Sequence, residues 1–496
     1  MNIIKKNKIF IYLFFVLLFG GCKNIEDVAD IQPTTILVEE AAIRTPADAD
    51  RVLTAAYAQV RGLYLSFVST SDYCSDDLKI DPTGGNRGQA MYNYIFDSNT
   101  TSSSGVWSAS FIALNYINIT IKRLNEMDIL PADVSTKNRI LGEAYALRAF
   151  VHFDLLRFFA SDNLGVPYIE RPTGATDLVS RLSTSDCYAK IMNDITTAQG
   201  FLPVSTYPMN AASASRLNSL AVTALKARIH LVRGEWANAI STVNQILPAP
   251  AALPASVRLS ARTDFASMYR PPYPNASNPN GEILFKLVYL SSGEGTHGNT
   301  NYYTLPTNNV FFQVTSDLLG LYVVNPTNPA LPTDIRFSVY FGKSSAPIRD
   351  VVFKYISNSA SAFVADFPVF RTSELYLIRA EANARLNNIT DAEYDFNTLR
   401  RARISNYADI SFTSLSQNAV IGSILSERRR ELTFEGHRFL DIRRLGLPLN
   451  RLDCSSTEPN GCNIPLTSPI YYKVKAFPIP FQERLTNPNM VQNPGY

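Results

Sequence analysis

The sequence lacks the short motifs that identify several enzyme classes. It contains no His-Glu-x-x-His zinc motif, no phosphate-binding glycine loop with a following lysine, and no Gly-x-Ser-x-Gly elbow. Its four histidines are scattered along 496 residues, at His152, His230, His297 and His437. We therefore predict no metal site, no cofactor and no enzyme. A glycoside hydrolase remains the alternative, because its two carboxylates can lie far apart in a sequence.

The sequence also carries little net charge. The formal charge of +3 includes Lys5, Lys6 and Lys8, which lie in a segment that we expect to be removed, and the first 21 residues hold no carboxylate. The mature chain is then close to neutral, so nucleic-acid binding is not expected. Ordinary fractions of hydrophobic (46%) and charged (18%) residues exclude a disordered chain.

Long apolar runs are absent after the N-terminus. Residues 9–19, IFIYLFFVLLF, follow basic residues and precede Gly20-Gly21-Cys22, which is the pattern of an export signal and too short for a comfortable membrane span. The ending is similar to a bacterial lipobox, with Phe19 where a smaller aliphatic residue is commoner. We predict a signal peptide at 1–21, lipidation of Cys22 and a tether at 22–45. An ordinary secretory signal is the alternative.

Cysteine is scarce after that position. Cys454 and Cys462 enclose the loop CSSTEPNGC, and an oxidising envelope compartment favours a disulfide there. A zinc site would need two further ligands nearby, and none is visible. Cys74 and Cys187 have no assigned partner.

Helical patterning dominates what remains and predicts a mainly α fold. The apolar residues of 143–159 almost encircle the helix axis, so this helix should be buried. Around the Gly234-x-Trp236 break, small alanines resemble the helix-turn-helix unit of tetratricopeptide repeats. The helical patterns cover residues 46–63, 106–127, 137–159, 213–247 and 373–403, the last as a helix pair joined around 387–391.

Two stretches between the helices read as loops. Residues 247–368 are rich in Pro, Asn, Ser and Thr and contain short apolar runs such as 283–290, which predicts long loops with a few short strands. Residues 66–104 form the second stretch. Loops of such length are usually functional or disordered.

The segment RRRELTFEGHRFLDIRRLG, at 428–446, concentrates charge. On one continuous helix its apolar residues form a single stripe, and charges pair at helical spacing. The expected pairs are Arg428 with Glu431, Glu435 with Arg438, and Arg438 with Asp441. We therefore predict an ion-paired helix packed on the body rather than a nucleic-acid reader. Glu431 and Glu435 should stay ionised beside arginines and His437 should be structural, which argues against an acid/base pair.

The same segment carries a family resemblance. ERRRELTFEGHRFLDIRR resembles the C-terminal signature of the SusD-like (RagB/SusD) nutrient-binding outer-membrane lipoproteins of Bacteroidetes. LGEAYALRAFVHFDLLRFFA with GVPYI, FPVFRTSELYLIRAEANARL with DFNTLRRAR, and the ending FPIPFQERLTNPNMVQNPGY are similar to further parts of the family, in the family's order. The fold implied is a tetratricopeptide-like helical-repeat scaffold with a long loop-rich layer carrying a few short strands.

The resemblance implies a body at 46–496. Its scaffold would comprise 46–65, 105–247 and 369–446, its ligand layer 66–104 and 248–368, and its tail 447–496. The implied function is binding of an extracellular oligosaccharide or polysaccharide, or less often another nutrient. The implied partner is a SusC-like TonB-dependent transporter, at an outer membrane to which the lipid anchors the protein, facing the exterior. A surface protein-interaction scaffold is a second alternative.

Sugars bind aromatic faces and polar side chains. Trp107 and Trp236 both occupy framework helices, so tyrosine, phenylalanine or arginine in the loops should provide the stacking surface. The candidate ligand-binding residues are Tyr73, Asp76 and Asp77 in SDYCSDDL, Arg87 and Tyr92 in GGNRGQAMY, and Tyr302, Tyr303, Asn308 and Asn309 in GNTNYYTLPTNNVFF.

Overall fold

The computed structural model describes residues 42–496 apart from 175, 206–208, 249–257, 270–277, 279–280, 290–301, 305–307, 326–327, 329, 356–364 and 455–461. The predicted signal peptide at 1–21, Cys22 and nearly all of the tether lie outside the described residues. In the part of the chain that is described, no helix combines the length and the apolar character needed to cross a membrane.

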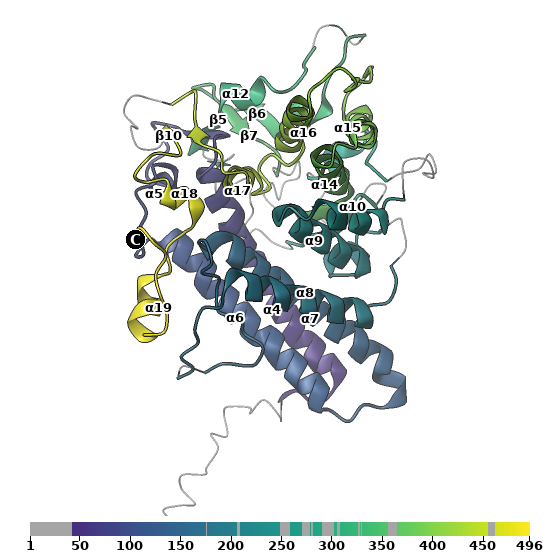
Figure 1. The fold of residues 1–496 in the computed structure, drawn as a ribbon, viewed down its shortest axis with the longest axis vertical. Helices are drawn as coiled ribbons and strands as arrows, with labels where there is room; N and C mark the ends of the chain where they lie inside the picture. The colour runs from purple at the N-terminus through teal and green to yellow at the C-terminus, as the bar shows by residue number, and fades with distance from the viewer. Residues whose placement is uncertain are drawn as a thin grey trace, which may run out of the picture.

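Three long helices form one end of the molecule, the lower part of Figure 1. They are α4 (Pro46–Tyr73), α6 (Thr101–Glu126) and α7 (Val134–Phe159), and α4 packs on both of the others. The first begins sharply because Thr45, the residue before Pro46, forms a reciprocal capping box with Asp48 in the first turn. From Ile140 onward α7 is buried on nearly all sides, as its apolar pattern predicts.

Helix pairs continue the scaffold toward the other end. α8 (Thr184–Phe201) packs on α7, α9 (Ser219–Val232) pairs with α10 (Trp236–Asn244), and α14 (Thr372–Arg385) pairs with α15 (Ile389–Arg403) and α16 (Gln417–Glu431). The turn between α9 and α10 places Gly234 at φ +70°, a conformation that glycine adopts without a steric penalty. The mainly α fold with helical pairs is therefore confirmed.

The described strands are short and form two-stranded antiparallel sheets. The pairs are β1 (Leu78–Ile80) with β5 (Phe312–Val314), β2 (Ile283–Leu287) with β8 (Phe367–Arg371), β3 (Tyr303–Thr304) with β4 (Asn309–Val310), β6 (Phe341–Lys343) with β7 (Asp350–Val352), and β9 (Leu449–Asn450) with β10 (Asn463–Ile464). The short helices are α5 (Gln89–Tyr92), α12 (Ser316–Leu319), α13 (Ile335–Tyr340), α17 (Arg438–Arg444), α18 (Tyr472–Lys475), α19 (Phe481–Thr486), η1 (Pro131–Asp133), η2 (Ser213–Ser215) and η4 (Phe265–Met268).

Two helix predictions need correction. The first helix continues to Tyr73, so residues 66–73 are not loop, because Phe67, Val68 and the polar residues after them are buried and keep their backbone hydrogen bonds within the helix. α8 was not singled out from the sequence. Its buried residues, such as Cys187, Ile191 and Ile195, occupy only a narrow stripe of an otherwise polar helix.

The charged segment at 428–446 is not one helix. α16 ends at Glu431 and α17 starts at Arg438, and between them Phe434 and Gly436 adopt φ +59° and +76°. The expected pairs at helical spacing are replaced by one pair between α16 and α17, Arg428 with Asp441, and by pairs with distant segments: Arg428 with Glu374, Glu435 with Arg371 and Lys354, and Arg438 with Asp76. The stripe is interrupted because buried charges need partners that one helix cannot supply.

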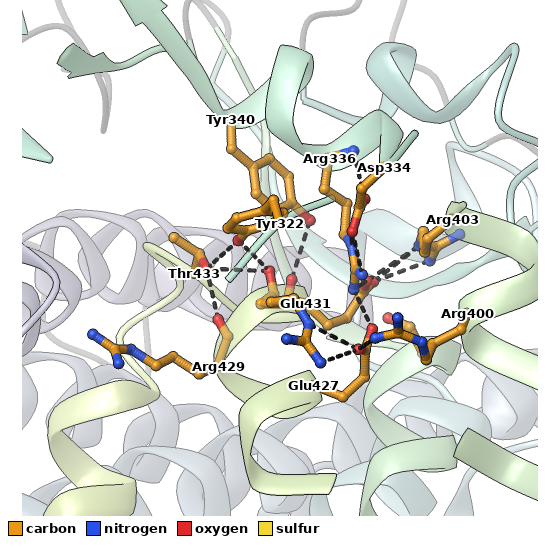
Figure 2. Close-up of polar contacts among 12 residues, drawn as sticks. Tyr322, Asp334, Arg336, Tyr340, Arg400, Arg403, Glu427, Arg429, Glu431 and Thr433 are labelled. Atoms are coloured by element: carbon orange, nitrogen blue, oxygen red, sulfur yellow. Dashed lines mark hydrogen bonds and ion pairs between the residues drawn. The ribbon is translucent and has the colours of Figure 1, made fainter. Parts of the chain in front are cut away.

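Glu431 is the centre of a buried ion network, which Figure 2 shows in part. Its side chain is 0% exposed and accepts hydrogen bonds from Arg336 at 3.0 Å, Arg371 at 2.8 Å and Arg403 at 3.0 Å. These arginines come from α13, the end of β8 and α15 respectively. Arg336 also pairs with Asp334 and Glu427, each at 2.7 Å. One carboxylate thereby joins the loop layer to two scaffold helices.

Replacing Glu431 should cost much of the stability of the fold. Glu431→Gln leaves three buried guanidinium groups without their shared counter-charge, and breaking a buried pair costs about 3–5 kcal/mol. Urea unfolding followed by circular dichroism measures the loss. Glu126→Gln, which removes the partly exposed partner of Arg123, should cost less than about 1 kcal/mol. Equal effects of the two changes would contradict a central role for Glu431.

Acid should weaken the fold partly through His152. Its Nδ1–H donates to the Arg148 carbonyl at 2.9 Å, its Nε2 accepts from the Ile169 amide at 3.0 Å, and burial lowers its pKa to about 3. The folded pKa lies below the unfolded value of about 6.5, so this contribution is complete above pH 6.5 and is lost as pH falls toward 3, by about 2 kcal/mol between pH 7 and 5.

Urea unfolding at pH 7 and pH 5 tests this pH dependence. His152→Gln should be less stable than the parent at pH 7 but should lose less stability on acidification. Leu155→Ala, in the same helix, is the control, because it removes buried packing without removing a titrating group. An unchanged pH difference in His152→Gln would refute the assignment.

Candidate functional site

Three segments of the loop layer converge on one surface. β1 and β5 pair with Leu78 opposite Val314, so the loop after β1 lies against the residues before β5. A Cβ at Gly84 would come within 2.7 Å of the Phe311 backbone, which shows how close the two chains run. Asn308 connects the third segment, which is the turn between β6 and β7. Its Oδ1 accepts from the Ser345 amide at 2.9 Å, and its Nδ2 donates to the Ala346 carbonyl at 3.2 Å.

Two half-buried arginines fix the base of this surface to the scaffold. Arg438 donates two hydrogen bonds of 2.6 Å to Asp76, and Arg429 donates one of 2.7 Å to Asp77. Both carboxylates are buried, and both are occupied by the segment at 428–446. They hold the loop after α4 in place rather than face a ligand.

Arg451 fixes the same loop from the tail. It donates to the carbonyls of Tyr73, Ser75 and Tyr92 at 2.7–2.8 Å, and its guanidinium lies 3.6 Å from the centroid of the Tyr92 ring. One side chain therefore satisfies three backbone carbonyls at the two ends of the stretch 73–92, which contains the candidates from Tyr73 to Tyr92.

The candidate tyrosines are buried. Tyr73 stacks on Phe312 at 4.5 Å between ring centroids and is 5% exposed. The Tyr302 hydroxyl donates to Asp72 at 2.5 Å, and burial raises the pKa of Asp72 to about 8. Tyr303 donates to Asn308 at 3.1 Å. In this structure these rings, with that of Tyr92, are packing surfaces and leave no open face for a sugar.

The candidates that do face outward are Arg87 and Asn309. The guanidinium of Arg87 lies over the ring of Phe311, 4.5 Å from its centroid. We use the term loop patch for the exposed residues Asn86, Arg87, Asn309, Ser345 and Ile348, together with the half-buried Phe311 beneath Arg87. Ile348 is 69% exposed. The patch combines amide, guanidinium and apolar groups, which is the mixture that sugar hydroxyls and C–H faces require.

The sequence candidates thus include Arg87 and Asn309, which face outward, together with side chains that are buried, such as Tyr73 and Tyr302. Phe311 was not among the candidates; it precedes the buried Phe312 at the start of β5, and strand alternation is the signal for its partial exposure. Asn86, Ser345 and Ile348 carry no comparable signal.

The remaining candidates are structural. Cys454 and Cys462 form a disulfide with 5.4 Å between Cα atoms, and Cys74 and Cys187 are buried free thiols. Trp107 is buried and donates to Glu483 at 3.1 Å, while Trp236 packs beside the core beneath Arg385. Both tryptophans therefore occupy framework positions.

No acid/base pair is evident at Glu431. Burial alone would raise the pKa of this carboxyl, but Arg403, Arg371 and Arg336 hold it well below its usual range, so the group stays ionised. His437 is buried, and burial together with the neighbouring arginines lowers its pKa well below its usual value. Among the residues that the structure describes, no group of three or more His, Cys, Asp or Glu side chains could hold a metal ion.

Comparison with known proteins covers both ends of the chain. Residues 344–496 match the model of the SusD family, and residues 38–231 match a model described as starch-binding associating with outer membrane. SusD-like protein P2 of Formosa agariphila is 24% identical over 99% of this chain and 100% of its own. The starch-binding protein SusD of Bacteroides thetaiotaomicron is 34% identical over 26% of this chain and 22% of its own.

Comparison of the fold with solved structures also leads to SusD proteins. A solved SusD superfamily protein from Bacteroides thetaiotaomicron superposes with a TM-score of 0.75 at 22% identity, covering 91% of this chain and 100% of that protein. The helical scaffold and the loop layer therefore occur together in that family.

Tyr302 should support the fold and not the ligand. Tyr302→Phe removes the hydroxyl that Asp72 accepts in the core, and an unsatisfied buried group costs about 1–3 kcal/mol. The free energy of unfolding should fall by that amount, while the affinity for any identified glycan should stay the same. Tyr116→Phe, at a partly exposed ring, is the control for stability. A selective loss of affinity would reinstate Tyr302 as a binding residue.

Proposed function

Because this chain belongs to the SusD-like family, we propose that it binds an extracellular oligosaccharide or polysaccharide at the cell surface and delivers it to a SusC-like TonB-dependent transporter. The observation that carries the proposal is the match of residues 38–231 to a model described as starch-binding associating with outer membrane. The named starch-binding relative supports the same ligand class.

The arrangement of the described residues suits capture of a large ligand. The loop patch is an open surface held on buried ion pairs, so a long glycan can lie across it without a closed pocket. Hydrogen bonds from Asn86, Arg87 and Asn309 would reach hydroxyls, and the apolar Ile348 and Phe311 would meet C–H faces. The helical scaffold would provide the rigid body that docks on the transporter.

The membrane attachment rests on the N-terminal sequence. The lipobox-like GGC at 20–22 would anchor the protein in the outer membrane through acylated Cys22, with the body facing the exterior. Radiolabelled palmitate incorporation, lost in Cys22→Ser, would support this attachment. Equal labelling of both proteins would exclude it.

Calorimetric titration tests ligand capture against the two alternatives. The protein is residues 23–496, and the panel holds α-glucans, β-glucans and their oligomers. Saturable heat with intact recovered sugar supports capture, whereas cleaved sugar would indicate a glycoside hydrolase. No heat across a broad panel would favour a surface protein-interaction scaffold.

The loop patch should set the affinity. Arg87→Ala with Asn309→Ala removes one charged and one neutral hydrogen-bonding side chain, which together should weaken binding about tenfold or more. Both side chains are exposed, so the free energy of unfolding should hardly change. The measurement is calorimetry with whichever glycan of the panel binds the parent protein.

A matched double variant controls for loss of charge and polarity. Arg51→Ala with Asn193→Ala changes the same residue types at exposed positions on α4 and α8. Its affinity should equal that of the parent. If the loop-patch variant bound the glycan as tightly as the parent, the binding surface would lie elsewhere.

A further inference from the structure

A cavity of about 240 Å³ lies away from the loop patch, where the ends of several helices meet. Its walls come from the end of α7, the start of α8, the end of α9, and α16, α17 and α18. Thr184, the first residue of α8, lies in the lining, so the positive end of that helix dipole is at the cavity. We call this space the arginine cavity.

Positive charge predominates in the lining. The cationic residues are Arg157, Arg228, Arg428, Arg443, Arg444 and Lys475, whereas the carboxylates of the described lining are Asp162 and Asp441. Several of these cations have carboxylate partners outside the lining, such as Glu374 for Arg228 and Glu381 for Arg444. The partners neutralise part of the charge but do not occupy the cavity.

Arg443 and Lys475 have no carboxylate partner within the described part of the chain. Arg443 donates to the carbonyls of Val474 at 2.7 Å and Phe158 at 3.1 Å, which are neutral groups. A buried guanidinium without a counter-charge is costly. The lining thus contains positive charge that no described carboxylate balances.

Four of the arginines also have unused hydrogen-bonding capacity. Arg157 Nε, Arg228 Nη1, Arg428 Nη1 and Arg443 Nη2 are buried and have no acceptor among the described residues. Buried donors are nearly always satisfied in proteins, and each unsatisfied one costs about 1–3 kcal/mol. Four such donors on residues around a single cavity complement the lone pairs of an oxyanion.

We propose that the arginine cavity binds a sulfate or phosphate group, either as the free ion or as an ester carried by a sugar. Guanidinium groups match the geometry of such oxygens with paired N–H donors. The four buried donors lie in the wall, on side chains whose other N–H groups are held by Asp154, Glu374, Asp441 and backbone carbonyls. The neutral His437 ring adds a donor, because its Nδ1 accepts from Arg428 at 3.2 Å and its Nε2 therefore carries the proton. This inference does not depend on the proposed binding of a neutral glycan by the loop patch.

Titration of the full chain in a non-ionic detergent tests the site. The probes are sodium sulfate, sodium phosphate, glucose 6-sulfate and glucose 6-phosphate, with sodium chloride at matched ionic strength as the reference. Saturable heat and a rise in the melting temperature are expected with at least one probe. Binding of the inorganic ions indicates a free-ion site, and binding of the esters alone indicates a sugar-borne group. Silence from all four probes overturns the proposal.

Two variants locate the binding, because replacing the buried arginines would disturb the fold. Lys475→Gln removes an exposed lining cation and should weaken binding about three- to tenfold, while Lys137→Gln, at the far end of α7, should leave it unchanged. Thr184→Glu places a carboxylate at the start of α8, where helix termini favour it, and should abolish binding by occupying the cavity. Parental affinity in both lining variants would show that the ion binds elsewhere and would overturn the assignment.

Discussion

The burial of Glu431 is the constraint on which the rest of the structure depends. One carboxylate accepts hydrogen bonds from Arg336, Arg371 and Arg403, and all of these side chains are at most 1% exposed. Such a group is stable only while every partner is in place, because an unpaired buried charge costs several kcal/mol. The positions of α13, β8, α15 and α16 are therefore mutually determined, although these elements are separated in the sequence.

The break between α16 and α17 follows from the same constraint. The turn at Phe434 and Gly436 places Glu435 2.7 Å from Arg371 and 2.6 Å from Lys354, so Glu435 shares Arg371 with Glu431. The turn also exposes backbone carbonyls that buried side chains satisfy: Lys354 donates to Thr433 at 2.7 Å and Tyr355 donates to Phe434 at 3.1 Å. The charge-rich segment at 428–446 can therefore be buried, because its charged and polar groups find ion-pair and hydrogen-bond partners in several elements.

The sequence predicted local structure but not the ion pairs between distant segments. Local patterns located the scaffold: the encircling apolar residues of α7, the Gly234 turn and the helix pair around residue 387 were all readable. Ion pairs between residues far apart in the chain could not be predicted from these patterns. Nothing in SDYCSDDL indicates that Asp76 and Asp77 face Arg438 and Arg429, more than 350 residues away. The candidate residues divide between buried anchors and outward groups according to distant partners, which the local sequence does not show.

The division between anchors and outward groups has a consequence for ligand choice. The anchors beneath the loop patch, among them Asp76, Asn308 and Arg451, make contacts to other segments, so replacing them disturbs the fold. Asn86, Asn309 and Ile348 project outward, where substitutions usually change stability by less than about 0.5 kcal/mol. The surface can therefore change its chemistry without altering the network around Glu431. Under the proposed function, one glycan could be exchanged for another through a few outward residues, while the body proposed to dock on the transporter stays the same.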